Sequence, residues 1–329
     1  MSALLQVRDL RKHYPVHKGV LGRAVGKVHA VDGISFSIAA GETLGLVGES
    51  GCGKSTAAKT ILRLVDPTAG TIEWRGQRID ALGRAAMRPF RRELQAVFQD
   101  PYSSLNPRLR AADIVAEPMH NYERFGAAEV RAKVAWLFEK VGLRPDQMIK
   151  FPHEFSGGQR QRLGIARALA VRPKLIVCDE PVSALDVSVQ AQVINLLEDL
   201  QAEFGVSYLF VAHDLAVVEH ISHRVAVMYL GKIVELTDKR SLFRDPQHPY
   251  TEALLSAVPV PDPRAQKKRI ILQGDVPSPI TPPPGCRFHT RCPYAEERCR
   301  REEPAMKEVR PGHFVACHLR DMRRDVKPQ

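Results

Sequence analysis

The 329-residue chain lacks any apolar run that approaches the ~18 residues a membrane-spanning helix requires. Its first residues also lack the basic flank and apolar core of a secretory signal. There is no low-complexity tract and no internal repeat. These absences predict a soluble, intracellular globular protein and exclude a channel. At about twice the ~150 residues of a typical single domain, the chain is expected to form one large domain with a substantial appendage.

Acidic residues are the minority charge. Lys and Arg number 48 against 37 Asp and Glu, which gives a formal charge of +11. Such an excess favours anionic partners: nucleotide phosphates, nucleic acid or an acidic membrane face. A solvated basic surface explains the same number equally well. The charge therefore selects no function by itself.

Strand and helix patterns alternate along the first 240 residues. Residues 4–8 and 28–38 alternate apolar and polar side chains around a glycine-containing loop at 18–27, as half-buried strands of a hairpin do. Continuous apolar runs predict buried strands at Thr43–Val47, Leu94–Phe98, Leu175–Cys178 and Tyr208–Ala212. This alternation predicts an α/β fold with a parallel sheet covered on both faces.

Two segments depart from that pattern. Residues 113–141 have helical periodicity without strands, which predicts a helical insertion. From Ser241 to Gln329 the chain becomes rich in proline, arginine and cysteine, so a second module is expected there.

A phosphate-binding motif follows the strand at 43–47. The nine residues Gly48-Glu-Ser-Gly-Cys-Gly-Lys-Ser-Thr56 lie between a predicted strand and a predicted helix, the context that a P-loop requires. Its glycines let backbone N–H groups face a β-phosphate, while Lys54 reaches the β- and γ-oxygens and Ser55 ligates Mg²⁺. Because Cys52 neighbours Lys54 and a helix N-terminus, we expect a reactive thiolate there.

Two acids end the predicted strand Leu175–Cys178. Asp179 is placed to hold Mg²⁺, and Glu180 is then free to act as general base on an attacking water. An apolar strand ending in two acids is weak evidence alone, but it gains weight downstream of a P-loop.

Three further features select among P-loop proteins. The run Ser156-Gly-Gly-Gln159 precedes a helix, which makes it a second anion site suited to a nucleotide held by another subunit. Gln99 and His213 each follow a predicted strand, at the strand end where ligands of open α/β sheets bind.

With these motifs, residues 1 to about 240 resemble the ATP-binding subunits of ABC transporters. The resemblance implies a P-loop NTPase fold with a RecA-like core, an antiparallel β subdomain and a helical subdomain at about 101–165. It implies catalytic roles for Lys54, Gln99, Glu180 and His213, and Mg²⁺ ligation by Ser55, Gln99 and Asp179. The implied ATP-binding residues are Tyr14, Gly48, Glu49, Ser50, Gly51, Cys52, Gly53, Lys54, Ser55 and Thr56. The implied signature and D-loop residues, which meet a partner's ATP in a head-to-tail dimer, are Ser156, Gly157, Gly158, Gln159 and Asp186.

Four of the six cysteines fall in the last 44 residues. Clustered thiols in an intracellular protein suggest a metal rather than disulfides. Cys286, Cys292, Cys299 and Cys317 have none of the paired C-x-x-C knuckles of zinc ribbons. A [4Fe–4S] cluster, a zinc site that includes nearby histidines, and free structural thiols all remain open.

The region 241–329 also resembles the C-terminal extension of dipeptide/oligopeptide importer ATPases, through Gln247-His-Pro-Tyr-Thr251, Pro282-Pro-Pro-Gly-Cys286 and Thr290-Arg-Cys-Pro293. The whole chain is similar to the F-type subunits of dipeptide permeases, which are ATP-binding subunits of that family. The resemblance implies a [4Fe–4S] cluster on the four cysteines, with zinc as the alternative.

It further implies the ATP-hydrolysing subunit of a bacterial peptide importer, peripheral on the cytoplasmic face of the inner membrane. The implied partners are a second, homologous ATPase, two membrane permeases and an external substrate-binding protein, and no nucleic acid. The alternative is a soluble ABC ATPase that acts on nucleic acid or ribosomes. The charge of +11 and the clustered thiols would also suit such a protein.

Overall fold

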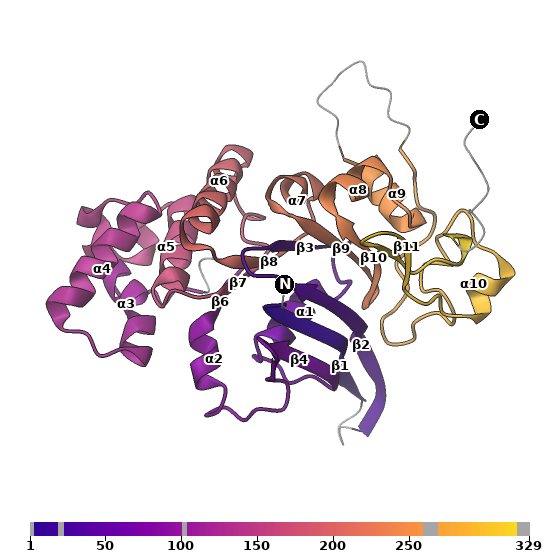
Figure 1. Cartoon of the computed structure of the whole chain (residues 1–329), viewed down its shortest axis with the longest axis horizontal. Helices are drawn as coiled ribbons and strands as arrows, with labels where there is room; N and C mark the ends of the chain where they lie inside the picture. The colour runs from indigo at the N-terminus through magenta and orange to yellow at the C-terminus, as the bar shows by residue number, and fades with distance from the viewer. Residues whose placement is uncertain (1–2, 19–22, 101–103, 259–268, 321–329) are drawn as a thin grey trace, which may run out of the picture. The chain divides into compact units, whose positions relative to one another are not determined.

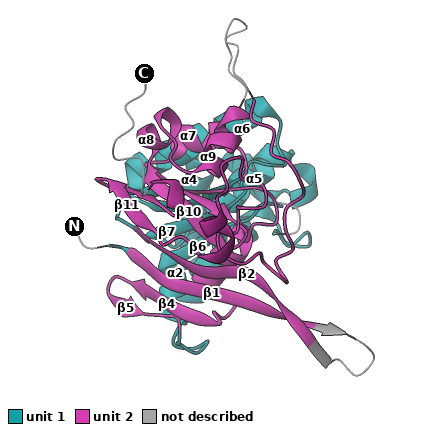
Figure 2. Cartoon of the chain, turned by 90° about the vertical axis from the view of Figure 1, so that its right-hand side faces the viewer, with its two compact units in different colours: residues 1–4, 38–43, 81–212 teal, residues 5–37, 44–80, 213–329 magenta. Residues whose placement is uncertain are grey.

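The structure, a computed structural model, describes residues 3–18, 23–100, 104–258 and 269–320 (Figure 1). The chain forms two compact units (Figure 2). Unit 1 consists of residues 1–4, 38–43 and 81–212, and unit 2 of residues 5–37, 44–80 and 213–329. Both units mix strands and helices, so the predicted α/β class is confirmed.

Unit 1 is built on parallel strands. Their order is β8 (Ser207–Ala212), β7 (Leu175–Asp179) and β6 (Leu94–Val97). β7 and β8 are buried along their whole length, as expected for apolar runs in a sheet covered on both faces. The carboxyl ends of β6 and β7 meet at one edge, since Val97 pairs with Cys178.

Helices make up the rest of unit 1. Their bounds are α2 (Arg88–Glu93), α3 (Ala111–Tyr122), α4 (Ala127–Lys140), α5 (Gly157–Leu169) and α6 (Val187–Phe204), with 3₁₀ turns η1 (Pro145–Ile149) and η2 (Pro152–Glu154). The predicted helical insertion corresponds to α3 and α4, which pack against each other and against α5. α4 buries Val130, Val134, Leu137 and Phe138, an apolar face at helical spacing. Residues 101–103 of the predicted helical subdomain lie outside the described residues.

One sheet of unit 2 is antiparallel. Its order is β2 (Arg23–Ile38), β1 (Leu5–Lys18), β4 (Ala69–Trp74) and β5 (Gln77–Arg78). The predicted hairpin is therefore present, but its strands run further than 4–8 and 28–38. Backbone pairing between adjacent strands needs no apolar pattern, so it continues where the alternation stops. Residues 19–22 of the predicted loop lie outside the described residues.

The second sheet of unit 2 joins the phosphate-binding region to the C-terminal extension. Its order is β11 (Lys307–Arg310), β12 (His313–Val315), β10 (Lys232–Asp238), β9 (Arg224–Tyr229) and β3 (Thr43–Val47). The remaining elements of the unit are α1 (Lys54–Ile61), α7 (Leu215–Ile221), α8 (Lys239–Arg244), α9 (Pro249–Ser256), α10 (Glu297–Arg301) and η3 (His318–Arg320). The extension thus continues a sheet of the unit through the antiparallel β10–β12 pair.

A buried carboxylate reinforces this junction. Glu235 of β10 is 0% exposed and accepts hydrogen bonds from the backbone N–H groups of Gln247 (2.7 Å) and His248 (2.9 Å). Nε2 of His313, on β12, lies 2.7 Å from the same carboxylate. Glu235 therefore ties β10, the start of α9 and β12 together, and without it each partner would be a buried polar group with one contact fewer.

Replacing Glu235 by Ala should lower the free energy of unfolding by about 3 kcal/mol, because it leaves two backbone N–H groups and Nε2 of His313 without their buried acceptor. Urea titration of the full chain measures the loss. Glu297→Ala is the matched control, since Glu297 forms an exposed i,i+4 pair with Arg301 and its loss should cost under about 0.5 kcal/mol. Equal losses in the two variants would contradict the role of Glu235.

Candidate nucleotide-binding site

The loop between β3 and α1 has the shape that its glycines permit. Gly48, Gly51 and Gly53 have φ of 155°, 79° and 107°, where side chains are disfavoured. A Cβ on Gly48 would lie 2.1 Å from the carbonyl oxygen of Met228, and one on Gly53 only 1.9 Å from that of Ala30. Gly53 occupies the N-cap position of α1 but has no side chain to accept a hydrogen bond from the first N–H groups of the helix. The loop is therefore a backbone cradle of the kind that binds phosphate.

Lys54 lies where a P-loop lysine should. Its side chain is buried, and Nζ donates hydrogen bonds to the carbonyl oxygens of Gly48 (2.8 Å) and Glu49 (3.1 Å). The ammonium thus faces the inside of the loop, and Ser55 follows it in the first turn of α1. The predicted phosphate ligands are therefore brought together within unit 2.

The expectation of a reactive Cys52 thiolate is wrong. Cys52 is 4% exposed, and burial raises the pKa of its thiol despite the opposing effect of Lys54. Its backbone has the structural role instead, because its carbonyl oxygen accepts a hydrogen bond from Gly231 N at 2.8 Å.

Tyr14, the predicted adenine-stacking residue, is half-buried on β1. The ammonium of Lys12 lies 4.8 Å from the centre of its ring, so a cation shares the aromatic surface. Tyr14 belongs to unit 2 with the phosphate-binding loop.

Unit 1 brings Gln99 and Glu180 together. Gln99 follows β6, and its Nε2 donates to Oε2 of Glu180 at 3.2 Å. Glu180 directly follows the buried Asp179 at the end of β7 and has φ of 47°, an uncommon value for a residue with a side chain. Its N–H donates to the carbonyl oxygen of Val211 on β8 at 2.9 Å, which helps to hold that conformation. His213 follows β8 directly and is exposed, and it is assigned to unit 2.

The predicted signature forms the first turn of α5. Ser156 is its N-cap: Ser156 Oγ accepts from Gln159 N at 3.3 Å, and Gln159 Oε1 accepts from Ser156 N at 3.0 Å. Gly158 faces α6, where a Cβ would lie 2.4 Å from Cγ1 of Val189. Asp186 caps α6 and is exposed. The glycine therefore lets the signature turn lie against the helix that follows the D-loop.

The four C-terminal cysteines lie near one another. Cys286 N donates to the carbonyl oxygen of Cys299 at 2.8 Å, and all four are free thiols. Burial, followed by the neighbouring thiols, raises the pKa of Cys286 to about 12 and that of Cys292 to about 11. Cys317 and Cys299 are among the neighbours that contribute to both shifts.

The nearby histidines each use a ring nitrogen elsewhere. His289 Nδ1 donates to the carbonyl oxygen of Cys286 (2.8 Å), and His318 Nε2 donates to that of Glu302 (2.9 Å). His313 is paired with Glu235. A metal-ligating histidine commonly donates its other ring N–H to a carbonyl oxygen or a carboxylate, so these contacts do not exclude the histidines. A zinc site that includes them stays a prediction beside the four thiols.

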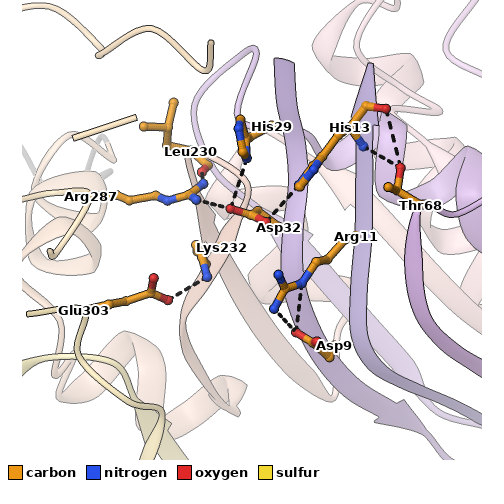
Figure 3. Close-up of polar contacts among 10 residues, drawn as sticks. All are labelled: Asp9, Arg11, His13, His29, Asp32, Thr68, Leu230, Lys232, Arg287 and Glu303. Atoms are coloured by element: carbon orange, nitrogen blue, oxygen red, sulfur yellow. Dashed lines mark hydrogen bonds and ion pairs between the residues drawn. The ribbon is translucent and has the colours of Figure 1, made fainter. Parts of the chain in front are cut away.

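Sequence reasoning missed a cluster of charges centred on Asp32 (Figure 3). Asp32 Oδ1 lies 2.9 Å from His13 Nε2, Oδ2 lies 3.4 Å from His29 Nδ1, and Arg287 pairs with the same carboxylate. Burial opposes ionisation, but His13 and Arg287 bring the pKa of Asp32 down to about 2. Although two histidines and an aspartate can bind a metal, the guanidinium already neutralises this carboxylate. We therefore interpret the cluster as an ion-pair network.

Residues 31–183 match the family described as "ABC transporter", and residues 234–299 match "Oligopeptide/dipeptide transporter, C-terminal region". The chain is 56% identical over 321 residues to the oligopeptide transport ATP-binding protein AppF of Bacillus subtilis, covering 97% of this chain and 98% of AppF. It is 55% identical to the probable peptide ABC transporter ATP-binding protein y4tS of Sinorhizobium fredii, covering 97% of this chain and 90% of y4tS.

Solved structures agree on the fold. The cbiO1 protein of Clostridium perfringens matches with a TM-score of 0.64 and 26% identity, over 74% of this chain and 92% of its own. The ATP-binding cassette MJ0796, solved as a dimer bound to ADP and Pi, also gives a TM-score of 0.64, with 28% identity over 72% of this chain and 99% of its own. The phosphate-binding loop, the acidic strand end and the C-terminal extension therefore have one explanation: the chain belongs to the ABC transporter ATP-binding proteins, in the branch that carries the oligopeptide/dipeptide transporter C-terminal region.

Proposed function

We propose that the chain is the ATP-hydrolysing subunit of a bacterial ABC importer for di- and oligopeptides. One observation carries this proposal. The same chain contains a P-loop, an acidic strand end and the oligopeptide/dipeptide transporter C-terminal region. We place the ATP-binding domain at residues 1–240, with its helical subdomain at about 101–165, and the C-terminal domain at residues 241–329.

The proposed chemistry is in-line attack of water on the γ-phosphate of ATP. Lys54 binds the β- and γ-phosphates and stabilises the charge that develops on them. Mg²⁺ would be held by Ser55, Gln99 and Asp179, and would neutralise the phosphate charge. The hydrogen bond between Gln99 and Glu180 supports their action as a pair, because it orients the carboxylate proposed as general base. His213 would contact the γ-phosphate.

The signature and the D-loop are proposed to act on a second ATPase. Ser156 and Asp186 are exposed in this chain, so both are accessible to a partner. In a head-to-tail dimer, the first turn of α5 would offer its N–H groups and its partial positive charge to the partner's ATP. The cassette MJ0796 was solved as a dimer bound to ADP and Pi, which supports the pairing of two ATPases. We propose a homologous but different ATPase as the partner.

Two membrane permeases and an external substrate-binding protein complete the proposed importer. Along the described residues, no helix is long and apolar enough to cross a membrane. A groove of about 580 Å³ runs between α3, α4 and η1, and Ile149 at its rim is 66% exposed. This apolar groove of the helical subdomain suits a permease segment, which would place the subunit on the cytoplasmic face of the inner membrane.

We propose a [4Fe–4S] cluster on Cys286, Cys292, Cys299 and Cys317. The donor set fits, because all four thiols are free and each of Cys286 and Cys292 has Cys299 and Cys317 as neighbours. Thiolates are the usual ligands of such clusters. A zinc site is the alternative to the [4Fe–4S] cluster. The cluster would supply a covalent clasp for a segment with little apolar core.

The alternative of a nucleic-acid or ribosome ATPase is not carried further. It rests on charge and clustered thiols, whereas AppF and y4tS, which each align with 97% of this chain, are named as peptide-transport proteins.

Glu180→Gln should lower ATP turnover by at least about 100-fold while MgATP binding persists, because it removes the general base and keeps the hydrogen bond with Gln99. Phosphate release and nucleotide binding are measured on the assembled complex. Glu219→Gln, an exposed position on α7, is the matched control and should hydrolyse normally. Turnover near the wild-type rate in Glu180→Gln would refute the assignment.

Anaerobically purified protein should contain about four iron atoms per chain, as a [4Fe–4S] cluster requires. Cys292→Ser should lose iron and make the extension more sensitive to proteases, whereas Cys52→Ser should keep its iron. Elemental analysis checks both variants. One zinc without iron in the wild-type protein would overturn the proposal.

A further inference from the structure

The phosphate-binding loop carries a carboxylate of its own. Glu49 directly follows Gly48, and Lys54 Nζ donates to its backbone carbonyl oxygen at 3.1 Å. A negative charge so close to a polyphosphate site repels the ligand unless it is neutralised and held aside. How the chain deals with Glu49 therefore bears on nucleotide affinity.

Arg291 of the C-terminal extension pairs with Glu49 through two parallel contacts. Nη1 lies 2.7 Å from Oε2, and Nη2 lies 3.1 Å from Oε1. The Arg291 side chain is 9% exposed and that of Glu49 is 28% exposed, so water screens the pair only partly. A planar guanidinium is suited to this two-point grip, and it fixes both the charge and the direction of the carboxylate.

The backbone of Glu49 is also held by a hydrogen bond. Its N–H donates to the hydroxyl oxygen of Tyr250 on α9 at 2.8 Å. Tyr250 is fully buried, and its ring centre lies 4.7 Å from that of Tyr229 and 5.4 Å from that of Phe288. Because this aromatic cluster fixes the hydroxyl, Glu49 is held at both its side chain and its main chain.

The segment that carries Arg291 is itself anchored at its other end. Arg287 pairs with Asp32 on β2 and donates to the carbonyl oxygen of Leu230 at 2.5 Å (Figure 3). Phe288, between the two arginines, is 1% exposed. Residues 287–291 are therefore fixed at three points and present Arg291 in a defined position.

We propose that Arg291 is a positioning residue for MgATP: it neutralises Glu49 and holds its carboxylate away from the phosphates. The proposal rests on ATP binding by this loop. Arg291 acts through Glu49 and touches no reacting atom. It therefore governs how tightly the nucleotide binds rather than how fast the bound nucleotide is hydrolysed.

Arg291→Gln should weaken MgATP binding by about tenfold, which corresponds to about 1.4 kcal/mol. Glu49→Gln should bind MgATP more tightly than the wild type, because it removes the repulsive carboxylate and keeps the backbone of the loop. The double variant Glu49→Gln/Arg291→Gln should bind like Glu49→Gln, because Arg291 has no charge left to neutralise. Titration of the full chain with a fluorescent ATP analogue and Mg²⁺ measures the four dissociation constants.

Two further measurements separate positioning from a structural role. In the assembled complex, Arg291→Gln should raise KM while kcat stays within about twofold. Its binding defect should also shrink as salt is raised, since an exposed Glu49 charge is then screened. Arg291→Lys keeps the charge without the two-point grip and should lie between wild type and Arg291→Gln, which keeps the proposal testable if Arg291→Gln folds poorly.

Arg298→Gln is the matched control. Arg298 lies on α10 of the same extension and forms an exposed pair with Glu302, so its loss should leave MgATP binding unchanged. Rescue of Arg291→Gln by Glu49→Gln would establish charge compensation. A double variant as weak as Arg291→Gln, or Arg291→Gln and Arg291→Lys both binding like the wild type, would overturn the proposal.

Discussion

Two positions of the phosphate-binding loop require glycine, because a backbone carbonyl group leaves no room for a side chain at each of them. The carbonyl oxygen of Met228 on β9 fills the space beside Gly48, and that of Ala30 on β2 fills the space beside Gly53. The loop is also tied to the turn between β9 and β10, since Gly231 N donates to Cys52 O, and Gly231 O accepts from Asp32 N on β2. The cradle thus depends on β2 and on the β9–β10 hairpin being in place, and the rest of unit 2 serves to fix these two segments.

The C-terminal extension contributes to that support. Strand β12 pairs with β10, and Glu235 joins the two through a buried contact with His313. Arg287 connects Asp32 of β2 with Leu230 in the hairpin turn. The extension therefore contacts the strands that support the phosphate-binding loop in unit 2. A metal cluster on its thiols would stabilise these strands as well as the extension itself.

The features that could be predicted from the sequence are those with a local signal. The strand, glycine loop and helix around Lys54 occupy consecutive residues, and the apolar runs of β7 and β8 mark buried strands without further information. Ser156 and Gln159 are three residues apart, the spacing of a capping box. Local pattern and local structure coincide in each case.

The remaining features depend on tertiary contacts that no local pattern announces. Arg291 and Glu49 are 242 residues apart, and Arg287 and Asp32 are 255 apart. The prediction of a reactive thiolate at Cys52 was wrong for the same reason. Its neighbours in sequence favour the thiolate, but burial raises the pKa of the thiol and outweighs them. The long β1–β2 pairing likewise follows from the partner strand rather than from the residue pattern.

The separation between Glu49 and its supports has a consequence for synthesis. A ribosome adds about 5–20 residues per second, so the 242 residues between Glu49 and Arg291 take roughly 10–50 s. The loop of the nascent chain lacks the guanidinium of Arg291 during that whole interval, and it lacks the hydroxyl of Tyr250 for the first 201 residues of it. Only a chain translated past Arg291 can present the loop with both supports, so a polypeptide cut short before the extension would carry the ATP motif without its complete setting.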